Sequence, residues 1–181
     1  QHRTRRRQRQ MCIRDRSTAI SKYWITKRAP YLVFEALECH GGPGYIEESI
    51  MPRLYREAPL NSIWEGSGNV MCLDVLRALQ RDKNALPSLF RELASARGSN
   101  KNFDESFSDL KETLQDPIDL EIEARLLTEK MACLIQASIF IKSGEEEKVS
   151  AFCNSRLGPR WSGAFGTLPT DTSFEYIMGG L

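Results

Sequence analysis

The stretch that decides the fold reads Arg53-Leu-Tyr-Arg-Glu-Ala-Pro-Leu-Asn-Ser-Ile-Trp-Glu-Gly-Ser-Gly-Asn69. Near its end a single carboxylate, Glu65, stands between an aromatic residue and a glycine. Glycines also flank Ser67, and a backbone without Cβ can pass close to another group. The local chemistry leaves two interpretations open. Glu65 is either an exposed glutamate in an ordinary capping loop, since loop glutamates are usually solvated, or a carboxylate positioned for a function.

The residues that follow predict a buried helix. Residues 70–79 read VMCLDVLRAL, and their apolar residues recur at the spacing of one helix face, at Met71, Val75, Leu76 and Leu79. Ser67 is placed to act as the N-cap of this helix. Glu65 is therefore expected on a tight loop just before a helix.

The first sixteen residues differ from the rest of the chain. Residues 1–16 read QHRTRRRQRQMCIRDR, with seven arginines against one acid and a net charge of +6. An apolar core is missing, so the segment does not read as a signal peptide. Arginine-rich runs can bind nucleic acid, but Met11-Cys-Ile-Arg-Asp15 also corresponds to a translated adapter used in DNA library preparation. We expect residues 1–16 to be a non-native leader.

Excluding that leader changes the charge of the chain. Residues 17–103 carry a net charge of +2 and residues 104–181 one of −7, so the remainder is mildly acidic at −5. Sequence-independent DNA binding depends on Lys and Arg side chains that neutralise phosphates. The composition therefore disfavours a general DNA-binding protein.

Composition also limits the other classes of function. No stretch approaches the ~20 apolar residues of a membrane span. The five cysteines are scattered without a C-x-x-C pair, and the two histidines, His2 and His40, cannot complete a zinc site. The Cys39-His40 pair is compatible with a metal ligand or a nucleophile but forms no motif by itself. Reduced thiols are the expectation, which favours a cytoplasmic protein without a metal site.

The chain predicts an all-α fold, because no segment shows the alternation of a strand. Helices are expected over residues 22–38, 46–57, 70–79, 87–97 and 103–115, with Asp104 as a cap of the last. Pro30 marks a kink or a junction between two helices, and Pro52 interrupts the second. Asp116-Pro117 starts the longest helix, the run Glu145-Glu-Glu147 leads into another, and residues 172–178 form a short last one.

Periodicity predicts which apolar residues these helices bury. In the first helix they are Tyr23, Trp24, Tyr31, Phe34 and Leu37; in the longest they are Ile118, Ile122, Leu126, Leu127, Met131, Leu134, Ile135 and Ile139; in the next they are Val149, Phe152 and Cys153. The run Gly98-Ser99-Asn100 stops a helix and is the expected boundary between a domain at 17–97 and a module at 98–181.

Three motifs carry a resemblance to a known family. They are Glu35-Ala-Leu-Glu-Cys-His-Gly-Gly-Pro-Gly-Tyr45, Arg53-Leu-Tyr-Arg56 and Asn61-Ser-Ile-Trp-Glu-Gly-Ser-Gly-Asn69. In this order and spacing, residues 22–79 resemble the C-terminal helical domain of the acyl-CoA dehydrogenases, close to the AidB subgroup. The resemblance implies a helical bundle, followed by an AidB-type helical module that matches more loosely.

The resemblance also implies roles for individual residues. Glu65 matches the catalytic base that removes the α-proton of an acyl thioester, which requires a carboxylate shielded from water. Gly41 and Gly42 match a pair that approaches the pyrophosphate of FAD, often in a neighbouring subunit. Ser67 and Asn69 match positions that hydrogen-bond the flavin dinucleotide. FAD is the implied cofactor and accepts the β-hydride.

Three residues depart from the usual family pattern. Glu38 stands where most dehydrogenases carry Gln, Trp64 replaces the more usual Tyr, and Ser67 replaces Thr. An acid close to a pyrophosphate is unfavourable, and an indole beside Glu65 narrows the acyl cavity. In the family a helical domain and a β-barrel domain precede this one, so the chain is expected to be a C-terminal part that is inactive alone.

Two alternative functions come with the resemblance. AidB-like proteins combine a weak dehydrogenase-type flavin site with DNA binding, which implies a DNA-protective flavoprotein; the acidic tail and its few cations, Lys148, Arg156 and Arg160, do not favour it. A second alternative is a helical module for oligomerisation, since such dehydrogenases assemble as homo-oligomers, commonly tetramers, through this domain. The favoured hypothesis is the acyl-CoA-oxidising flavoprotein.

Overall fold

The computed structural model describes residues 2–115 and 120–179, with side chains from residue 17 onward. Over these residues it contains nine α-helices, one 3₁₀ helix and no strand. The predicted all-α class is therefore confirmed. The chain divides into two compact units, which we describe separately. Unit 1 comprises Gln1–Asp82 with Glu121–Thr128, and unit 2 comprises Lys83–Leu120 with Glu129–Leu181.

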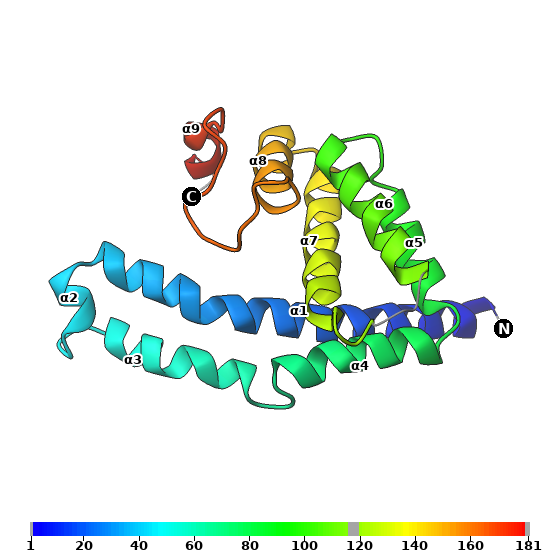
Figure 1. Ribbon diagram of the computed structural model, residues 1–181, viewed down its shortest axis with the longest axis horizontal. Coiled ribbons are helices and arrows are strands. Elements are labelled where there is room, and N and C mark those ends of the chain that lie inside the picture. The colour runs from blue at the N-terminus through cyan, green and yellow to red at the C-terminus, as the bar shows by residue number, and fades with distance from the viewer. Residues whose placement is uncertain (1, 116–119, 180–181) are drawn as a thin grey trace. The chain divides into compact units, whose positions relative to one another are not determined.

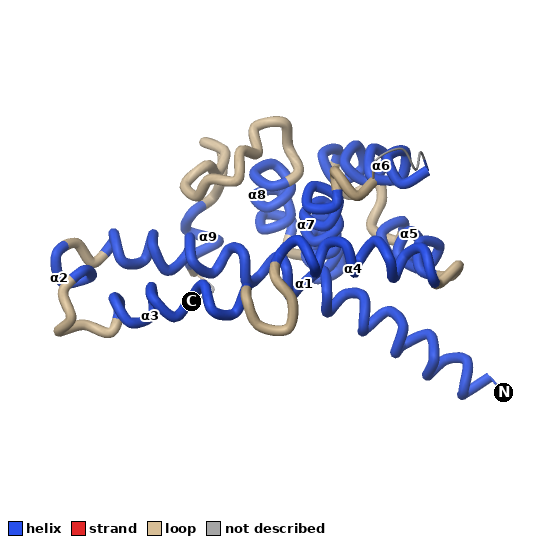
Figure 2. The backbone as a smooth tube through the Cα atoms, turned by 60° about the horizontal axis from the view of Figure 1, so that its bottom comes forward, coloured by secondary structure: helices blue, strands red, loops and turns tan. Residues whose placement is uncertain are grey.

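Unit 1 is a long helical hairpin (Figure 1). Its first arm is α1 (His2–Cys39), and the chain turns at the short helix α2 (Gly42–Tyr45). The second arm returns along the first as α3 (Met51–Glu57), the 3₁₀ helix η1 (Ala58–Ser62) and α4 (Gly68–Arg81). Figure 2 shows the two arms side by side and the loop between η1 and α4.

The core of unit 1 forms where α1 packs against α4. Ile20, Tyr23 and Trp24 of α1 are buried, and the buried apolar residues of α4 are Cys72, Val75, Leu76 and Leu79. The prediction for α4 was therefore right at three of its four positions, while Met71 is only half-buried. Burial raises the pKa of the Cys72 thiol, which contacts the hydroxyl groups of Thr128 and Tyr23.

The distal half of the hairpin is less covered than the sequence predicts. Tyr31 and Phe34 were expected in the core, but they are 68% and 41% exposed. Within unit 1, α1 packs against α2, α3, η1 and α4, and this packing leaves both side chains uncovered. The centroid of the Phe34 ring lies 5.9 Å from that of the Tyr55 ring on α3.

Two prolines lie inside helices of unit 1. α1 continues through Pro30 as one helix, so of the two predicted roles, kink or junction, the junction is excluded. Pro52 lies in the first turn of α3, where the missing N–H has no helical partner to lose, and it starts the helix instead of interrupting it. Residues 46–50, predicted as helical, form turns and bends.

Unit 2 is built from α5 (Ala85–Ala94), α6 (Lys101–Gln115), the part of α7 (Ala124–Ser143) after Thr128, α8 (Glu146–Arg156) and α9 (Phe174–Met178). Two aromatic pairs pack in this unit. Phe103 and Phe107 are buried with their ring centroids 6.3 Å apart, and Phe140 and Phe152 are half-buried with their centroids 5.2 Å apart. The buried residues of these helices include Leu93, Phe103, Leu110, Met131, Leu134, Val149 and Cys153.

The start of α6 corrects one predicted cap. The helix begins at Lys101, and the Asn100 side chain accepts hydrogen bonds from the N–H groups of Asn102 (2.9 Å) and Phe103 (3.3 Å). Asn100 is therefore the N-cap. Asp104 instead accepts from the N–H of Gly98, at 3.1 and 3.2 Å, and so holds the preceding turn.

The buried face of α7 is rotated from the predicted one. Leu127, Met131 and Leu134 are buried as expected, but Leu126 and Ile139 are 55% and 62% exposed. Small residues, Ala132, Cys133, Ala137 and Ser138, complete the buried face instead. Ile122, 80% exposed, precedes the helix, which begins at Ala124 after a turn. Ile118 and the predicted start at residues 116–117 lie outside the described residues.

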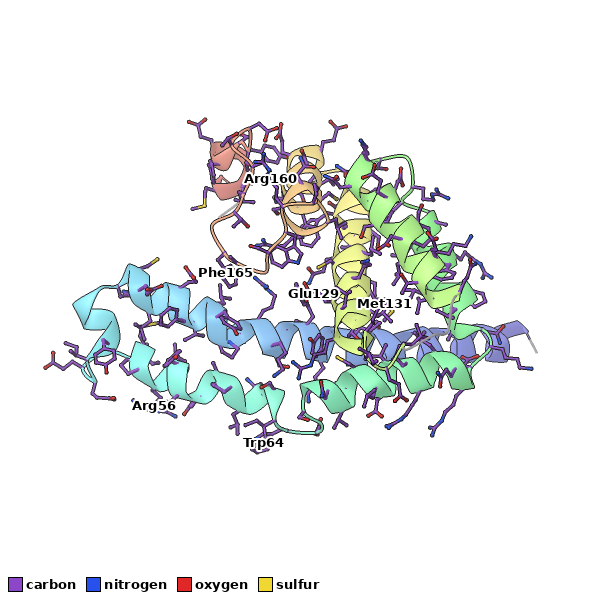
Figure 3. The ribbon with its side chains drawn as sticks, viewed as in Figure 1. Arg56, Trp64, Glu129, Met131, Arg160 and Phe165 are labelled. Atoms are coloured by element: carbon purple, nitrogen blue, oxygen red, sulfur yellow. The ribbon has the colours of Figure 1, made fainter. Side chains whose placement is uncertain are left out.

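Trp161 anchors the segment between α8 and α9. Its indole N–H donates to Oε1 of Glu129 at 2.8 Å, and the Arg156 guanidinium lies 4.4 Å from its ring centroid. Figure 3 labels Glu129 on α7 in this region. Among the described helices, none is long and apolar enough to cross a membrane.

Candidate functional site

The predicted site residues lie at two places in unit 1. Glu65, Ser67 and Asn69 belong to the junction between η1 and α4, where Figure 3 labels Trp64. Gly41 and Gly42 lie at the tip of the hairpin, at the junction of α1 and α2 (Figure 1). The structure therefore brings the three loop residues together and leaves the glycine pair apart from them.

The loop presents Glu65 in an unusual backbone conformation. Its φ of 53° makes it the one non-glycine residue with positive φ among the described residues. A side chain makes this left-handed region unfavourable, so such a residue needs support from its surroundings. Its side chain is exposed, as is that of Trp64 at 64%, and within the described part of the chain the carboxylate has no hydrogen-bond or ion-pair partner.

Two lysines of α1 contact this loop. The Lys22 ammonium donates to the carbonyl oxygens of Trp64 and Gly66, each at 2.5 Å. Lys27 lies against Gly68, because a Cβ built there would stand 2.5 Å from its Cε. The loop is thus tied to the helix that it crosses, and positive charge stands beside it.

The start of α4 offers uncommitted polar groups. Ser67 occupies the N-cap position, as predicted, but its hydroxyl makes no capping hydrogen bond. The first N–H groups of a helix lack helical partners and favour an anion. Asn69 accepts a hydrogen bond through Oδ1 from Nε of Arg125 at 2.5 Å, which leaves its amide donors available.

The glycine pair at the tip has open space around it. Gly41 has a φ of 61°, and a Cβ added at either Gly41 or Gly42 would meet nothing within 4 Å. Gly44 is different, since a Cβ there would stand 2.2 Å from the carbonyl oxygen of Leu37. Gly44 therefore closes the tip by packing, whereas the open backbone of Gly41 and Gly42 can admit another group.

Beside the tip, Arg56 forms a bidentate ion pair with Glu47. The two guanidinium nitrogens lie 2.6 and 3.1 Å from the two carboxylate oxygens, and the Arg56 guanidinium lowers the pKa of Glu47. A pocket of about 480 Å³ lies here, lined by Leu37, Tyr45, Ile46, Glu47, Pro52, Tyr55 and Arg56. Glu38 is exposed close to the glycine pair in sequence and is not part of this lining.

Comparison with known proteins identifies the family to which the first part of the chain is related. Residues 2–80 match the model of the acyl-CoA dehydrogenase C-terminal domain. This part of the chain belongs to the acyl-CoA dehydrogenase family. The match covers α1 to α4 and includes both groups of predicted site residues. It also includes residues 2–16, whose origin as a non-native leader stays a prediction.

Three curated relatives are similar to the chain. AidB of Escherichia coli (strain K12), named as an acyl-CoA dehydrogenase, is 39% identical over 143 residues, which are 79% of this chain and 26% of AidB. Acyl-CoA dehydrogenase family member 11 of Caenorhabditis elegans is 36% identical over 101 residues, 56% of this chain and 16% of that protein. The 3-(aryl)acrylate reductase of Clostridium sporogenes (strain ATCC 15579) is 38% identical over 56 residues, 31% of this chain and 15% of that protein.

The chain thus spans a small part of each relative, no more than 26% of its length. The alignment with AidB is longer than the match to the dehydrogenase domain and therefore continues into the residues that follow it. In the structure, unit 1 ends at Asp82 and unit 2 begins at Lys83, and residues 121–128 belong to unit 1 again. The predicted boundary between a domain at 17–97 and a module at 98–181 stays a prediction.

Sequence reasoning missed three cations that lie beside the predicted site residues. Lys22 and Lys27 lie on α1, and Arg125 lies in the segment that returns to unit 1. The one available signal was the position of the two lysines on the helix. Lys22 and Lys27 stand on either side of the buried residues Tyr23 and Trp24 in the sequence, and so lie beside the face of α1 that packs against α4. The contact of Arg125 with Asn69, across 56 residues, had no local signal.

The cysteines of the described residues lie outside any cluster of metal-ligand side chains. Among the described residues, Cys39, Cys72, Cys133 and Cys153 form no disulfide, and burial raises the pKa of the Cys153 thiol to about 11. Within the part of the chain that the structure describes, no group of three or more His, Cys, Asp or Glu side chains could hold a metal ion. Cys39 is exposed and has no such cluster around it.

Two glycines at the tip of the hairpin, Gly44 and Gly42, are expected to differ in how much their substitution lowers stability. Gly44→Ala should destabilise unit 1 by about 1–3 kcal/mol, since the new methyl group overlaps backbone that cannot move aside cheaply. Gly42→Ala, with open space around it, should change stability by less than about 0.5 kcal/mol. Hydrogen exchange of peptides from α3 and α4, measured in the 181-residue chain against denaturant, reports on unit 1 in both variants. An equal loss of stability in the two variants would contradict the packing described here for Gly44 and Gly42.

Proposed function

We propose that the chain is the C-terminal part of an FAD-dependent acyl-CoA dehydrogenase-like flavoprotein, in which Glu65 is the catalytic base. The observation that carries the proposal is the loop itself. An unpartnered carboxylate is held in a left-handed conformation directly before an uncapped helix N-terminus. Such a carboxylate is free to accept a proton, and polar groups next to it are free to hold a cofactor.

The residues present fit a phosphate-bearing cofactor. The Ser67 hydroxyl, the amide donors of Asn69 and the first N–H groups of α4 face no competing cap in the described structure. Lys22, Lys27 and Arg125 add positive charge around the loop. A dinucleotide would be held by Ser67 and Asn69, with its pyrophosphate at the bare backbone of Gly41 and Gly42.

The chemistry assigned to this chain is proton transfer. Glu65 takes the α-proton of an acyl-CoA thioester, and the electron pair of that C–H bond becomes the α,β double bond as the β-hydride leaves. FAD, when bound, supplies the acceptor for that hydride. Because one relative is named a reductase, the same residues would also serve the reverse reaction, in which Glu65 returns the proton.

Glu65 would need cover from elsewhere, because it is exposed here and an active base must be shielded from water. The apolar surface of the hairpin suggests that further protein covers it: Ile25, Tyr31, Leu32, Ile63 and Trp64 are each more than half exposed. We propose a homo-oligomer, a tetramer, in which the glycine pair of one subunit serves the flavin of another. That arrangement also accounts for the distance between the two groups of site residues.

The DNA-protective alternative has less support in unit 2. Several cations of unit 2 already form ion pairs with carboxylates: Lys130 pairs with Asp109, Lys142 with Glu92 and Lys148 with Glu145. Arg156 is stacked on Trp161. Within the described residues, these contacts occupy four cations that a DNA-binding surface would use to neutralise phosphates. A cytoplasmic location belongs to the favoured proposal, and the cysteines of the described residues form no disulfide.

Flavin content tests this proposal. The full-length protein should purify yellow with FAD bound, whereas residues 17–181, which supply one wall of the cofactor site, should purify colourless. Gly42→Ala in the full-length protein should lower the FAD content, because the new Cβ would stand where the pyrophosphate approaches. Absorbance after gel filtration measures all three samples. Stoichiometric FAD on residues 17–181, or unchanged FAD in the Gly42 variant, would contradict the proposed division of the site.

A further inference from the structure

Lys22 is placed to fix the conformation of the loop that carries Glu65. Its ammonium donates to the carbonyl oxygens of Trp64 and Gly66, the residues on either side of Glu65 in the chain. Both distances are 2.5 Å, and the partners lie 42 and 44 residues away in sequence. We propose that Lys22 is a positioning residue, which holds Glu65 in its left-handed conformation for proton transfer. This inference rests on the proposed role of Glu65.

The two hydrogen bonds constrain the backbone where rotation would move the carboxylate. One carbonyl belongs to the peptide before Glu65 and the other to the peptide after Gly66, so a shared cation restricts rotation of both peptides. Glu65 at φ 53° and Gly66 at φ 112° lie between them. A non-glycine residue persists in this region only when its surroundings enforce it. Within the described residues, Lys22 is the side chain that bonds to this backbone.

A lysine suits this task for two reasons. It comes from a rigid position, because its neighbours Tyr23 and Trp24 are buried in the core between α1 and α4. Its ammonium has three donors and no acceptor, so two can bind carbonyl groups at once. Since those donors are used on the backbone, the charge does not pair with Glu65, and the carboxylate stays uncommitted. A direct ion pair would instead have made it a weaker base.

The first measurement concerns the loop and does not depend on catalysis. Lys22→Met keeps the alkyl stem and removes the donors. Amide hydrogen exchange of the 181-residue chain should then accelerate on the order of tenfold in the peptide covering residues 63–71, where the N–H groups of Ile63 and Trp64 bond to Leu60. Exchange in α6 should stay unchanged. Lys83→Met, an exposed lysine outside the loop, is the matched control for the lost charge.

The second measurement concerns turnover in the full-length flavoprotein. Lys22→Met should lower kcat on the order of tenfold to a hundredfold at unchanged flavin content, and Lys22→Arg, which restores donors, should recover most of the loss. Lys22→Gln, which keeps the NH₂ donors of a neutral side-chain amide, provides a second variant should the Met variant fold poorly, and its kcat should be intermediate. A general structural defect would lower flavin content and the melting temperature together and would not be rescued by Arg.

The two measurements separate the failure of this inference from failure of the proposed function. Normal loop exchange and normal kcat in Lys22→Met, while Glu65→Gln is inactive, would overturn the positioning role alone. If loop exchange is faster in Lys22→Met while Lys22→Met and Glu65→Gln both keep full activity, Glu65 takes no part in the reaction. That result would overturn the positioning role and the proposed function together. Loop acceleration together with a kcat loss that Arg rescues is the expected result.

Discussion

Glu65→Gln should lower turnover of the full-length flavoprotein by about 10²–10⁴-fold, the range of a general base. Glutamine has nearly the same shape and cannot accept the α-proton. Because the Glu65 side chain is exposed and has no partner among the described residues, its replacement removes no packing and no ion pair. The loss should therefore appear in kcat, with flavin content and melting temperature unchanged.

The experiment compares reduction of bound flavin by excess acyl-CoA under anaerobic conditions in the wild-type and variant proteins. Glu48→Gln serves as the matched control, since Glu48 is also an exposed glutamate of unit 1 without a partner in the described structure. It should leave the rate unchanged. Equal rates in wild type and the Glu65 variant, at equal flavin loading, would exclude Glu65 as the base and would favour the non-catalytic, DNA-protective alternative.

The sequence predicted where the candidate site residues lie along the chain better than it predicted which residues contact them. Glu65, Ser67 and Asn69 lie within one short stretch, so residue type and the onset of α4 place them on one loop. The groups that hold this loop come from distant residues, Lys22 and Arg125. A hydrogen bond across 42 or 56 residues depends on how helices pack, which periodicity does not specify. The conformation of Glu65 was likewise invisible, because nothing in the residue type calls for positive φ.

Helix positions were also more predictable than helix faces. The apolar spacing of α4 gave Val75, Leu76 and Leu79 as buried, because one neighbouring helix covers one face. Tyr31 and Phe34 follow the same spacing on α1, yet the hairpin has no further helix there to cover them. Spacing shows which residues share a face; burial also requires a partner for that face, and the partner can belong to another chain.

Two residues of α7 turn this distinction into a measurement. The sequence assigns Leu134 and Ile139 equally to the core, but Leu134 is fully buried and Ile139 is 62% exposed. Leu134→Ala should therefore lower the free energy of unfolding of unit 2 by about 2–5 kcal/mol, through lost transfer energy and the cavity that remains. Ile139→Ala should cost less than about 0.5 kcal/mol, as is usual for an exposed position.

Because the chain has two compact units, one denaturation midpoint would average over both. Hydrogen exchange of peptides from α6 and α8, measured in the 181-residue chain against denaturant, reports on unit 2 by itself. A large loss in the Ile139 variant of this chain would mean that the predicted face of α7 is the buried one. If only the full-length assembly shows that loss, Ile139 is covered by another part of the protein, and the apolar spacing read from the sequence describes the assembled protein better than the single chain.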